Sequence, residues 1–339
     1  MENSKYILDI RDLVVEYHTE DGIVHAVNGV NLQIEPKKTL GLVGETGAGK
    51  TTTAMSILRI VPDPPGVIKS GKIFLDGNDI FSLSVREMRK LRGRFASMIF
   101  QDPMTSLNPV MPVVEQIAEV IKLHEKASTI DAYEKALVML DTVGIARDRA
   151  NNYAHQLSGG MRQRIVIAIA LACSPKLLIA DEPTTALDVT IQAQILEVMR
   201  DLRNKFNTAM IMITHDLGIV AEICDDVSVM YAGKIVEHGT LEEVFKQTRH
   251  PYTEGLFNSL PNINYRSAKL KPIPGLMPDP TEIPPGCTFA PRCDYAIEKC
   301  FTEPPSNRQF SDTHYALCMR YEDPAFCVKG RVSAWQTQS

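Results

Sequence analysis

The stretch GETGAGKT, Gly44 to Thr51, decides the fold class because it matches the phosphate-loop pattern G-x-x-x-x-G-K-[ST]. An apolar segment, TLGLV (39–43), precedes it and a helix-like segment, TTAMSILRIV (52–61), follows. Strand, glycine loop and helix in this order form a β–loop–α unit, so we predict an α/β fold built around a phosphate site. The residues expected to contact the nucleotide are Gly44, Glu45, Thr46, Gly47, Ala48, Gly49, Lys50, Thr51 and Thr52.

Each residue type in this loop has a chemical reason. Glycines allow backbone N–H groups to turn toward the phosphates, Lys50 is expected to reach the β- and γ-phosphates, and the Thr51 hydroxyl is expected to bind Mg²⁺. A chance match of the pattern is the alternative. Its position between an apolar strand and a helix argues against chance, because that is the context the motif requires.

A second acidic motif follows another apolar strand, in KLLIADEP (176–183). Asp181 at the end of the strand can hold Mg²⁺, and Glu182 can orient and deprotonate an attacking water. Two adjacent carboxylates at a strand end are more often a solvated turn, but the phosphate loop elsewhere in the chain favours the catalytic interpretation.

Hydrophobic patterning divides the chain into regions. Two opening segments with partial alternation, 7–17 and 24–34, predict an N-terminal antiparallel β-layer. Apolar residues at helical spacing predict an inserted helical subdomain at about 105–155. A second α/β stretch is expected to contain helices at 162–172 and 191–206, strands at 176–181 and 209–214, and a strand pair at 226–239.

Composition excludes some classes of function. The 339 residues carry a net charge of −5, which disfavours nucleic-acid binding through a basic surface. No apolar run approaches the ~20 residues of a membrane-spanning helix, and no secretory signal is visible, so we expect a cytoplasmic protein. Five of the seven cysteines lie in the last 53 residues, and in a reducing compartment such a cluster is more often a metal site than a set of disulfides.

A third motif, LSGGMRQR (157–164), lies between the first two. Together the three motifs resemble the signature of the ATP-binding cassette (ABC) family, and the resemblance covers roughly residues 5 to 240. It implies a P-loop NTPase fold of the ABC type that binds and hydrolyses ATP with Mg²⁺. It also implies that Ser158, Gly159 and Gly160 contact the γ-phosphate of ATP on a second subunit. Met161 stands where many members carry glutamine.

Four further residues match elements of the family one by one. By resemblance, Gln101 in IFQDP touches Mg²⁺ and water, and Asp188 in TTALD crosses the dimer interface. His215 in MITHD matches the switch histidine that contacts the γ-phosphate and Glu182. Tyr17 stands where the family keeps a ring that stacks on adenine, although a strand-end aromatic is also often a core or rim residue.

The flanks are similar to a narrower group. FQDPMTSLNPVMPV (100–113), RHPYTEGLFNSLP (249–261) and PPGCTFAPRCDYA (284–296) resemble the ATPase subunits of dipeptide and oligopeptide importers, a group that also serves nickel and some sugar systems. The resemblance implies a dimer with a similar or identical ATPase chain, two membrane-spanning permease subunits and an extracytoplasmic binding protein as partners. It places the chain on the inner face of the cell membrane. The rivals are a soluble ABC ATPase acting on ribosomes or DNA, and a binding module without hydrolysis.

Composition changes after Gly239. Ten prolines between Pro261 and Pro305 predict a separate, irregular module at 241–339 that follows a nucleotide-binding domain at 1–240. The spacing C-x₅-C-x₆-C-x₁₇-C does not distinguish zinc, an iron–sulfur cluster, disulfides or free thiols. The importer resemblance favours a [4Fe–4S] cluster on Cys287, Cys293, Cys300 and Cys318, with Zn²⁺ as the alternative and Cys327 or His314 as reserve ligands.

Overall fold

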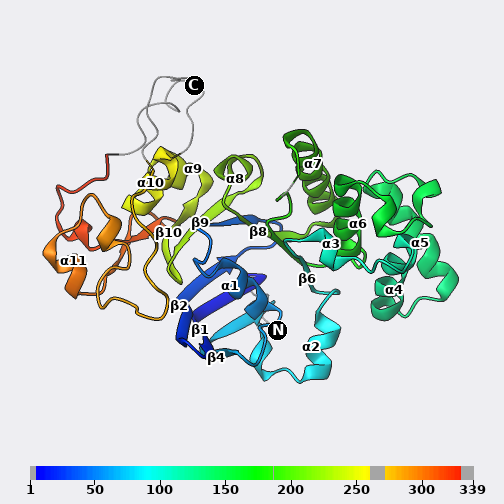
Figure 1. Cartoon of the computed structure of the whole chain (residues 1–339), viewed down its shortest axis with the longest axis horizontal. Coiled ribbons are helices and arrows are strands. Elements are labelled where there is room, and N and C mark those ends of the chain that lie inside the picture. Colours follow the sequence, from blue (N-terminus) through cyan, green and yellow to red (C-terminus); the bar gives the residue numbers. More distant parts are fainter. Residues whose placement is uncertain (1–4, 186, 260–271, 330–339) are drawn as a thin grey trace.

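The computed structural model describes residues 5–185, 187–259 and 272–329, without the side chains of residues 103 and 104. Two β-sheets form the centre of the chain (Figure 1). One is a four-stranded antiparallel sheet in the order β2-β1-β4-β5, and the other is an eight-stranded sheet in the order β11-β12-β10-β9-β3-β8-β7-β6. This architecture confirms the predicted α/β fold with an added antiparallel layer.

Five adjacent strands of the large sheet are parallel, from β9 through β3, β8 and β7 to the edge strand β6. Every residue of β3, β7 and β8 is buried, as expected for strands covered on both faces. Alternate residues of β8 enter two cores: Met210 and Met212 pack with the helices of one face, and Ile211 and Ile213 pack toward the antiparallel sheet. The strands are β3 (Thr39–Val43), β6 (Ala96–Ile99), β7 (Leu177–Asp181), β8 (Ala209–Thr214) and β9 (Asp226–Tyr231).

Helices cover both faces of these strands. α7 (Val189–Phe206) and α8 (Leu217–Ile223) share the first core with β8, while α1 (Lys50–Ile57) contributes Ala54 and Ile57 to the second core. α1 begins directly after the glycine loop that leaves β3. The loop therefore lies at the carboxyl edge of the parallel strands, where open α/β sheets bind ligands.

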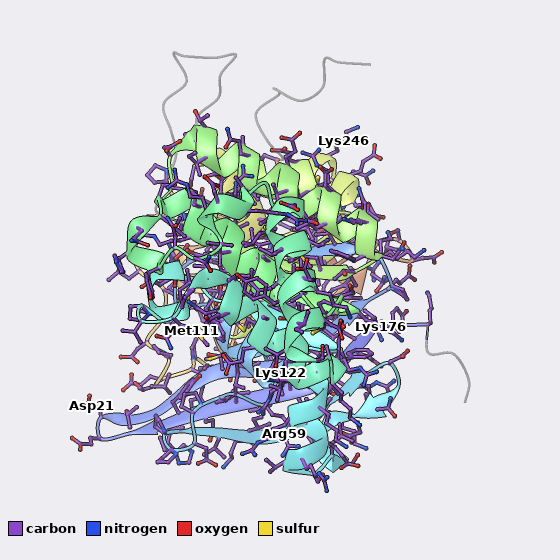
Figure 2. The ribbon with its side chains drawn as sticks, turned by 90° about the vertical axis from the view of Figure 1, so that its right-hand side faces the viewer. Asp21, Arg59, Met111, Lys122, Lys176 and Lys246 are labelled. Atoms are coloured by element: carbon purple, nitrogen blue, oxygen red, sulfur yellow. The ribbon has the colours of Figure 1, made fainter. Side chains whose placement is uncertain are left out.

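The antiparallel sheet contains β1 (Leu8–Thr19), β2 (Gly22–Ile34), β4 (Gly66–Leu75) and β5 (Asn78–Asp79). The two predicted N-terminal strands are confirmed as the pair β1–β2. β4, which had not been predicted, pairs with the other edge of β1. Figure 2 shows the turn between β1 and β2, marked by Asp21, projecting at one edge of the molecule.

The predicted helical region is also present. Four helices cluster on one side of the molecule (Figure 1). They are α3 (Pro103–Ser106), α4 (Val113–Glu125), α5 (Thr129–Thr142) and α6 (Gly159–Leu171), and they follow α2 (Val85–Leu91) and β6 in the sequence. α4 buries Val113, Ile117 and Ile121, which repeat every four residues along one face. None of the helices in the described ranges is both long enough and apolar enough to cross a membrane.

The C-terminal region lies at the opposite end from the helical subdomain (Figure 1). It starts with two helices, α9 (Leu241–Lys246) and α10 (Pro251–Asn258), so the expectation of an irregular module from residue 241 is wrong for this part. Within residues 272–329, regular structure is limited to β11 (Asn307–Gln309), β12 (Tyr315–Leu317), α11 (Glu298–Thr302) and short 3₁₀ turns. β12 pairs with β10 (Lys234–Thr240), so the region extends the large sheet; the boundary at 240/241 stays a prediction.

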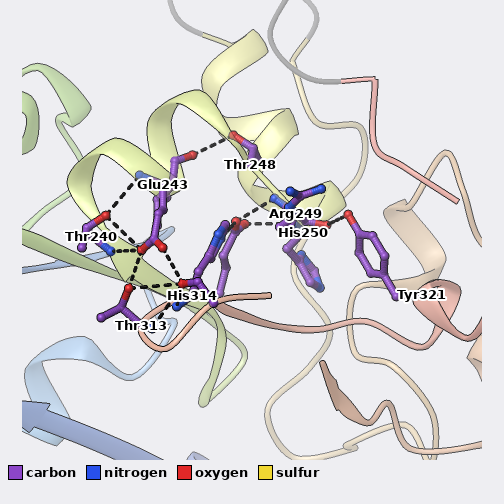
Figure 3. A network of polar contacts seen from close by, with 11 residues as sticks. Thr240, Glu243, Thr248, Arg249, His250, Thr313, His314 and Tyr321 are labelled. Atoms are coloured by element: carbon purple, nitrogen blue, oxygen red, sulfur yellow. Dashed lines mark hydrogen bonds and ion pairs between the residues drawn. The ribbon is translucent and has the colours of Figure 1, made fainter. Parts of the chain in front are cut away.

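A buried glutamate, Glu237, joins the large sheet to the C-terminal region, and Figure 3 labels its partners Arg249, His250 and His314. Glu237 on β10 is 0% exposed and accepts hydrogen bonds from the backbone N–H groups of Arg249, at 2.7 Å, and His250, at 2.9 Å. Its Oε1 also lies 2.9 Å from Nε2 of His314, which is 1% exposed. Three partners satisfy the carboxylate that burial would otherwise destabilise. They fix the start of α10 and the turn before β12 to the sheet.

A second carboxylate, that of Glu243, also links the start of α9 to the C-terminal region. Glu243 forms a capping box with Thr240 at the start of α9 and accepts hydrogen bonds from Ser311 and Thr313 in the C-terminal region (Figure 3). Burial acts to raise the pKa of Glu243, but these donors outweigh it and lower the pKa to about 2. The carboxylate is therefore ionised at any physiological pH.

Candidate functional site

The phosphate loop has a backbone that only glycine fits at two points. Gly44 has φ of 155°, and a Cβ there would lie 2.1 Å from the carbonyl oxygen of Met230. Gly49 has φ of 101°, and a Cβ there would lie 2.3 Å from the carbonyl oxygen of Ala26. Any other residue would meet backbone atoms at both positions, so these glycines fix the turn that leads into α1.

The side chain of Lys50 is held across this loop. Its Nζ donates hydrogen bonds to the carbonyl oxygens of Gly44, at 2.7 Å, and Glu45, at 2.8 Å, and the residue is 6% exposed. Burial lowers the pKa of Lys50, against the opposing charges of Glu182, Asp181 and Glu45. A buried ammonium inside a loop of this shape is suited to an anionic ligand, since an anion would compensate the lost hydration.

Thr51 and Asp181 lie together beside the loop. The Thr51 side chain is close enough to the Asp181 carboxylate to act on its pKa, and Asp181 is 3% exposed. Burial raises the pKa of Asp181, while Thr51 and Lys50 act in the opposite direction. A hydroxyl and a carboxylate offer hard oxygen ligands of the kind that Mg²⁺ takes beside nucleotide phosphates, so the residue types fit this ion.

Glu182 is the centre of the second cluster. Its Oε2 accepts a hydrogen bond from Nε2 of Gln101, at 3.2 Å, and another from the Thr185 hydroxyl, at 2.9 Å. Its Oε1 lies 3.1 Å from Nδ1 of His215. Gln101 follows β6, Glu182 follows β7 and His215 follows β8, so the carboxyl ends of three neighbouring strands bring them together.

The Glu182 backbone and charge are both unusual. Its φ of 47° is in the left-handed region, which non-glycine residues enter rarely and mainly at functional sites. Burial acts to raise the pKa of Glu182, but hydrogen bonds from His215 and Thr185 and the charges of His215 and Lys50 outweigh it, so the pKa falls below its usual value. The group is an ionised carboxylate aimed between two polar side chains, able to accept a proton from water.

Tyr17 lies at the entrance to α1. Its hydroxyl is 3.2 Å from the Thr52 hydroxyl, and its ring is half-buried on β1 next to Gly66. The predicted residue is thus beside the phosphate loop. Its stacking on adenine stays a prediction.

The signature residues form a separate group. Ser158 caps α6 and accepts a hydrogen bond from the backbone N–H of Met161, at 3.3 Å. Asp188 caps α7 in the same way, accepting from the N–H of Ile191 at 2.9 Å. A Cβ on Gly160 would lie 2.6 Å from Ile191, so the two helix starts pack together. Both caps are exposed, and their contact with a second subunit stays a prediction.

Three residues of the site were not predicted from the sequence. Thr185 supports Glu182, as described above. Tyr252 accepts a hydrogen bond from the backbone N–H of Glu45 at 2.9 Å, and Arg292 forms an ion pair with the Glu45 carboxylate at 2.9 Å. Tyr252 and Arg292 lie within the segments that resemble peptide importers, so the sequence did single out their surroundings. Nothing in those segments indicated a contact with the phosphate loop.

The four clustered cysteines line one small cavity. Cys287, Cys293, Cys300 and Cys318 surround about 10 Å³, together with residues that include His250 and Phe289. All four are free thiols, and burial raises the pKa of Cys293 and of Cys318 to about 12. A cavity of this size admits about one water molecule. The described residues contain no group of three or more His, Cys, Asp or Glu side chains arranged to hold a metal ion, so the structure does not support the predicted cluster or zinc.

The two reserve ligands lie elsewhere. His314 is hydrogen-bonded to Glu237, and the thiol of the exposed Cys327 lies 3.0 Å from the carbonyl oxygen of Val328. Neither residue lines the cysteine cavity. The structure therefore argues against both as the fourth ligand.

Two family models match the chain. Residues 27–185 match the model described as ABC transporter, and residues 236–300 match the model described as oligopeptide/dipeptide transporter, C-terminal region. The second model spans α9, α10 and the first three clustered cysteines. Transporter family models thus match both the part of the chain that contains the phosphate loop and the part that begins at β10.

Individual proteins similar to this chain are also named as transport ATP-binding proteins. The oligopeptide transport ATP-binding protein OppD of Bacillus subtilis (strain 168) is 51% identical over 312 residues, which cover 91% of this chain and 87% of that protein. OppD of Salmonella typhimurium is 50% identical over 316 residues, covering 93% of each. Among solved structures, cbiO1 from Clostridium perfringens, part of the ABC transporter complex cbiONQ, has a TM-score of 0.62 at 29% identity, covering 72% of this chain and 92% of its own.

Proposed function

The chain belongs to the ATP-binding cassette ATPases, in the oligopeptide and dipeptide transporter group, and from this premise we propose that it powers peptide import across the cytoplasmic membrane. In this proposal it binds and hydrolyses ATP while separate membrane-spanning subunits carry the substrate. The relatives named as oligopeptide transport ATP-binding proteins support peptides as the cargo over nickel or oligosaccharides.

One observation carries the catalytic part of the proposal. Glu182 is surrounded by Gln101, Thr185 and His215. The preceding residue, Asp181 at the end of β7, is close enough to Thr51 and Lys50 of the phosphate loop for both to act on its pKa. A general base and a phosphate-binding loop are thereby adjacent. A binding module without hydrolysis would have no need of such a base.

The chemistry assigned to these residues is a direct hydrolysis. Water attacks the γ-phosphorus, a new O–P bond forms, and the bond between the γ-phosphorus and the bridging oxygen of ADP breaks. Glu182 accepts the proton of the water, while His215 and Gln101 hold the carboxylate and the water in position. The Lys50 ammonium and the loop N–H groups stabilise the negative charge that moves onto the phosphoryl oxygens.

Mg²⁺ belongs to this site in the proposal. Thr51 and Asp181 would hold it, with Gln101 beside it, and it would neutralise charge on the β- and γ-phosphates. The charge of Asp181 is needed for this, so the carboxylate must be ionised despite the burial that raises its pKa.

The signature residues would act in trans. Ser158, Gly159 and Gly160 stand at the exposed start of α6, where backbone N–H groups and the helix dipole attract an anion. We assign them to the γ-phosphate bound by a second ATPase chain, with Asp188 at the same interface. Contacts made only with the γ-phosphate would favour the closed dimer, and hydrolysis would release it.

Transport is the direct test of the proposal. We expect vesicles containing the chain, its partner ATPase and two permease subunits to take up a labelled oligopeptide only when ATP is inside with the ATPase. The measurement is peptide uptake supported by an extracytoplasmic binding protein, with nickel and an oligosaccharide offered in parallel. Uptake of nickel or sugar alone would reassign the cargo, and ATPase stimulation by ribosomes or DNA without permeases would favour the soluble rival.

The cysteine cluster carries a second proposal, the [4Fe–4S] cofactor with Zn²⁺ as the alternative. Four cysteines around one cavity motivate this proposal, but they are not arranged to hold a metal ion in the described structure and the cavity volume is about 10 Å³, so binding would require the thiols to move apart. We expect anaerobically purified protein to absorb light at about 400 nm and to contain iron. Cys300→Ser should remove both signals, and a colourless protein with one zinc per chain would reject the iron–sulfur assignment.

A further inference from the structure

The C-terminal region reaches the phosphate loop through one arginine. Nη1 of Arg292 lies 2.9 Å from Oε2 of Glu45, the second residue of the loop, although 247 positions separate the two residues in the chain. The Arg292 side chain is 7% exposed and that of Glu45 is 30% exposed. The pair is therefore mostly shielded from solvent, where charges interact more strongly than at an open surface.

Arg292 is fixed from three sides. Besides the Glu45 carboxylate, its Nη1 donates to the hydroxyl of Tyr231 at 3.2 Å, and its Nε donates to the carbonyl oxygen of Pro274 at 2.9 Å. The guanidinium carbon lies 5.8 Å from the centre of the Tyr231 ring. A guanidinium held in this way has a fixed position, so its charge acts at one place on the loop.

Glu45 connects this arginine to the centre of the nucleotide site. Its carbonyl oxygen accepts the 2.8 Å hydrogen bond from Lys50 Nζ, and its N–H donates to the hydroxyl of Tyr252, which is 0% exposed. Its carboxylate is close enough to the ammonium to affect the pKa of Lys50. Glu45 thus places a carboxylate on the same loop that is to receive a triphosphate.

A negative side chain beside a triphosphate weakens binding unless another charge compensates it. We propose that Arg292 is a positioning residue of the ATP site: it neutralises Glu45 and holds the phosphate loop open for the triphosphate, so the C-terminal region is part of the nucleotide site. This inference rests on the proposed ATPase function. It predicts that removing Arg292 weakens ATP binding mainly because the negative charge of Glu45 is then uncompensated.

The test is a double-mutant cycle on nucleotide affinity. Arg292→Met keeps the length of the side chain and removes its charge, and we expect it to weaken binding of a fluorescent ATP analogue with Mg²⁺ by about tenfold. Glu45→Gln combined with Arg292→Met should return the Kd to within about threefold of wild type, because the uncompensated negative charge is gone. Glu45→Gln alone should tighten binding, because the positive charge of Arg292 then acts on the triphosphate without its counter-charge. Arg292→Lys, which keeps the charge, should bind better than Arg292→Met.

The control is Arg320→Ala, which removes a guanidinium of the same region that stacks on Phe326, 4.8 Å from its ring centre, and should leave the Kd unchanged. Melting temperatures of all variants identify loss of folding, and Arg292→Lys decides the question if Arg292→Met does not fold. A double variant as weak as Arg292→Met, or Arg292→Lys as weak as a fully uncharged residue, would overturn the inference in favour of a structural role. Absence of binding by the wild type would instead reject the proposed function.

Discussion

Replacing Glu182 by glutamine is expected to lower the rate of ATP hydrolysis by about 10²- to 10⁴-fold while ATP binding is retained. The amide has nearly the same shape as the carboxylate, so it can still accept a hydrogen bond from Gln101 or Thr185. It cannot take the proton of the attacking water. Phosphate release measures the turnover, a fluorescent-nucleotide titration measures the affinity, and gel filtration with ATP should show a trapped dimer.

A matched control separates this effect from a general loss of charge. Glu222→Gln changes an exposed glutamate on α8 that is paired only with Arg200 in the contacts of the described chain. It should hydrolyse ATP at the wild-type rate. Near-normal phosphate release from Glu182→Gln would remove Glu182 from the catalytic role and would shift attention to His215 or a water held by Gln101.

The parts of the fold that were predicted are those determined by short segments of sequence. β3, β7 and β8 are continuous apolar runs, and their burial on both faces follows from that composition. β4 was missed because Gly71, with φ of 101°, interrupts its alternation where the pairing with β1 shifts register. α2 has seven residues, too few for a clear helical period.

Long-range contacts explain the remaining differences. The proline content agrees with the small amount of regular structure between residues 272 and 329, but the pairing of β12 with β10 joins residues about 80 positions apart. The Glu237 network and the Arg292–Glu45 pair depend on the same tertiary arrangement. Gln101 and His215 were assigned by the family resemblance, and only Glu182 was also read from its position at a strand end. The structure gives the physical reason why the three meet: each follows one of three neighbouring parallel strands, whose carboxyl ends lie at one edge of the sheet.

Replacing Lys50 by alanine is expected to weaken nucleotide binding by on the order of a hundredfold, because charge-assisted hydrogen bonds to the β- and γ-phosphates are lost. The ammonium is the buried cation that the loop carbonyls of Gly44 and Glu45 hold in place. Titration with a fluorescent nucleotide measures the loss. Lys176→Ala is the matched control, since this lysine, labelled in Figure 2, is exposed and is paired with Asp76. It directly precedes β7, whereas Asp181 and the nucleotide site are at the carboxyl end of that strand.

The fold should tolerate the Lys50 variant, which makes the binding result interpretable. Lys50 is the first residue of α1, and alanine has at least as high a helix propensity as lysine. The variant leaves the carbonyl oxygens of Gly44 and Glu45 without their ammonium partner, so its melting temperature is measured beside the Kd. A Kd within about threefold of wild type would show that the loop N–H groups alone bind the phosphates. A large loss with an unchanged melting temperature assigns the affinity to the ammonium itself.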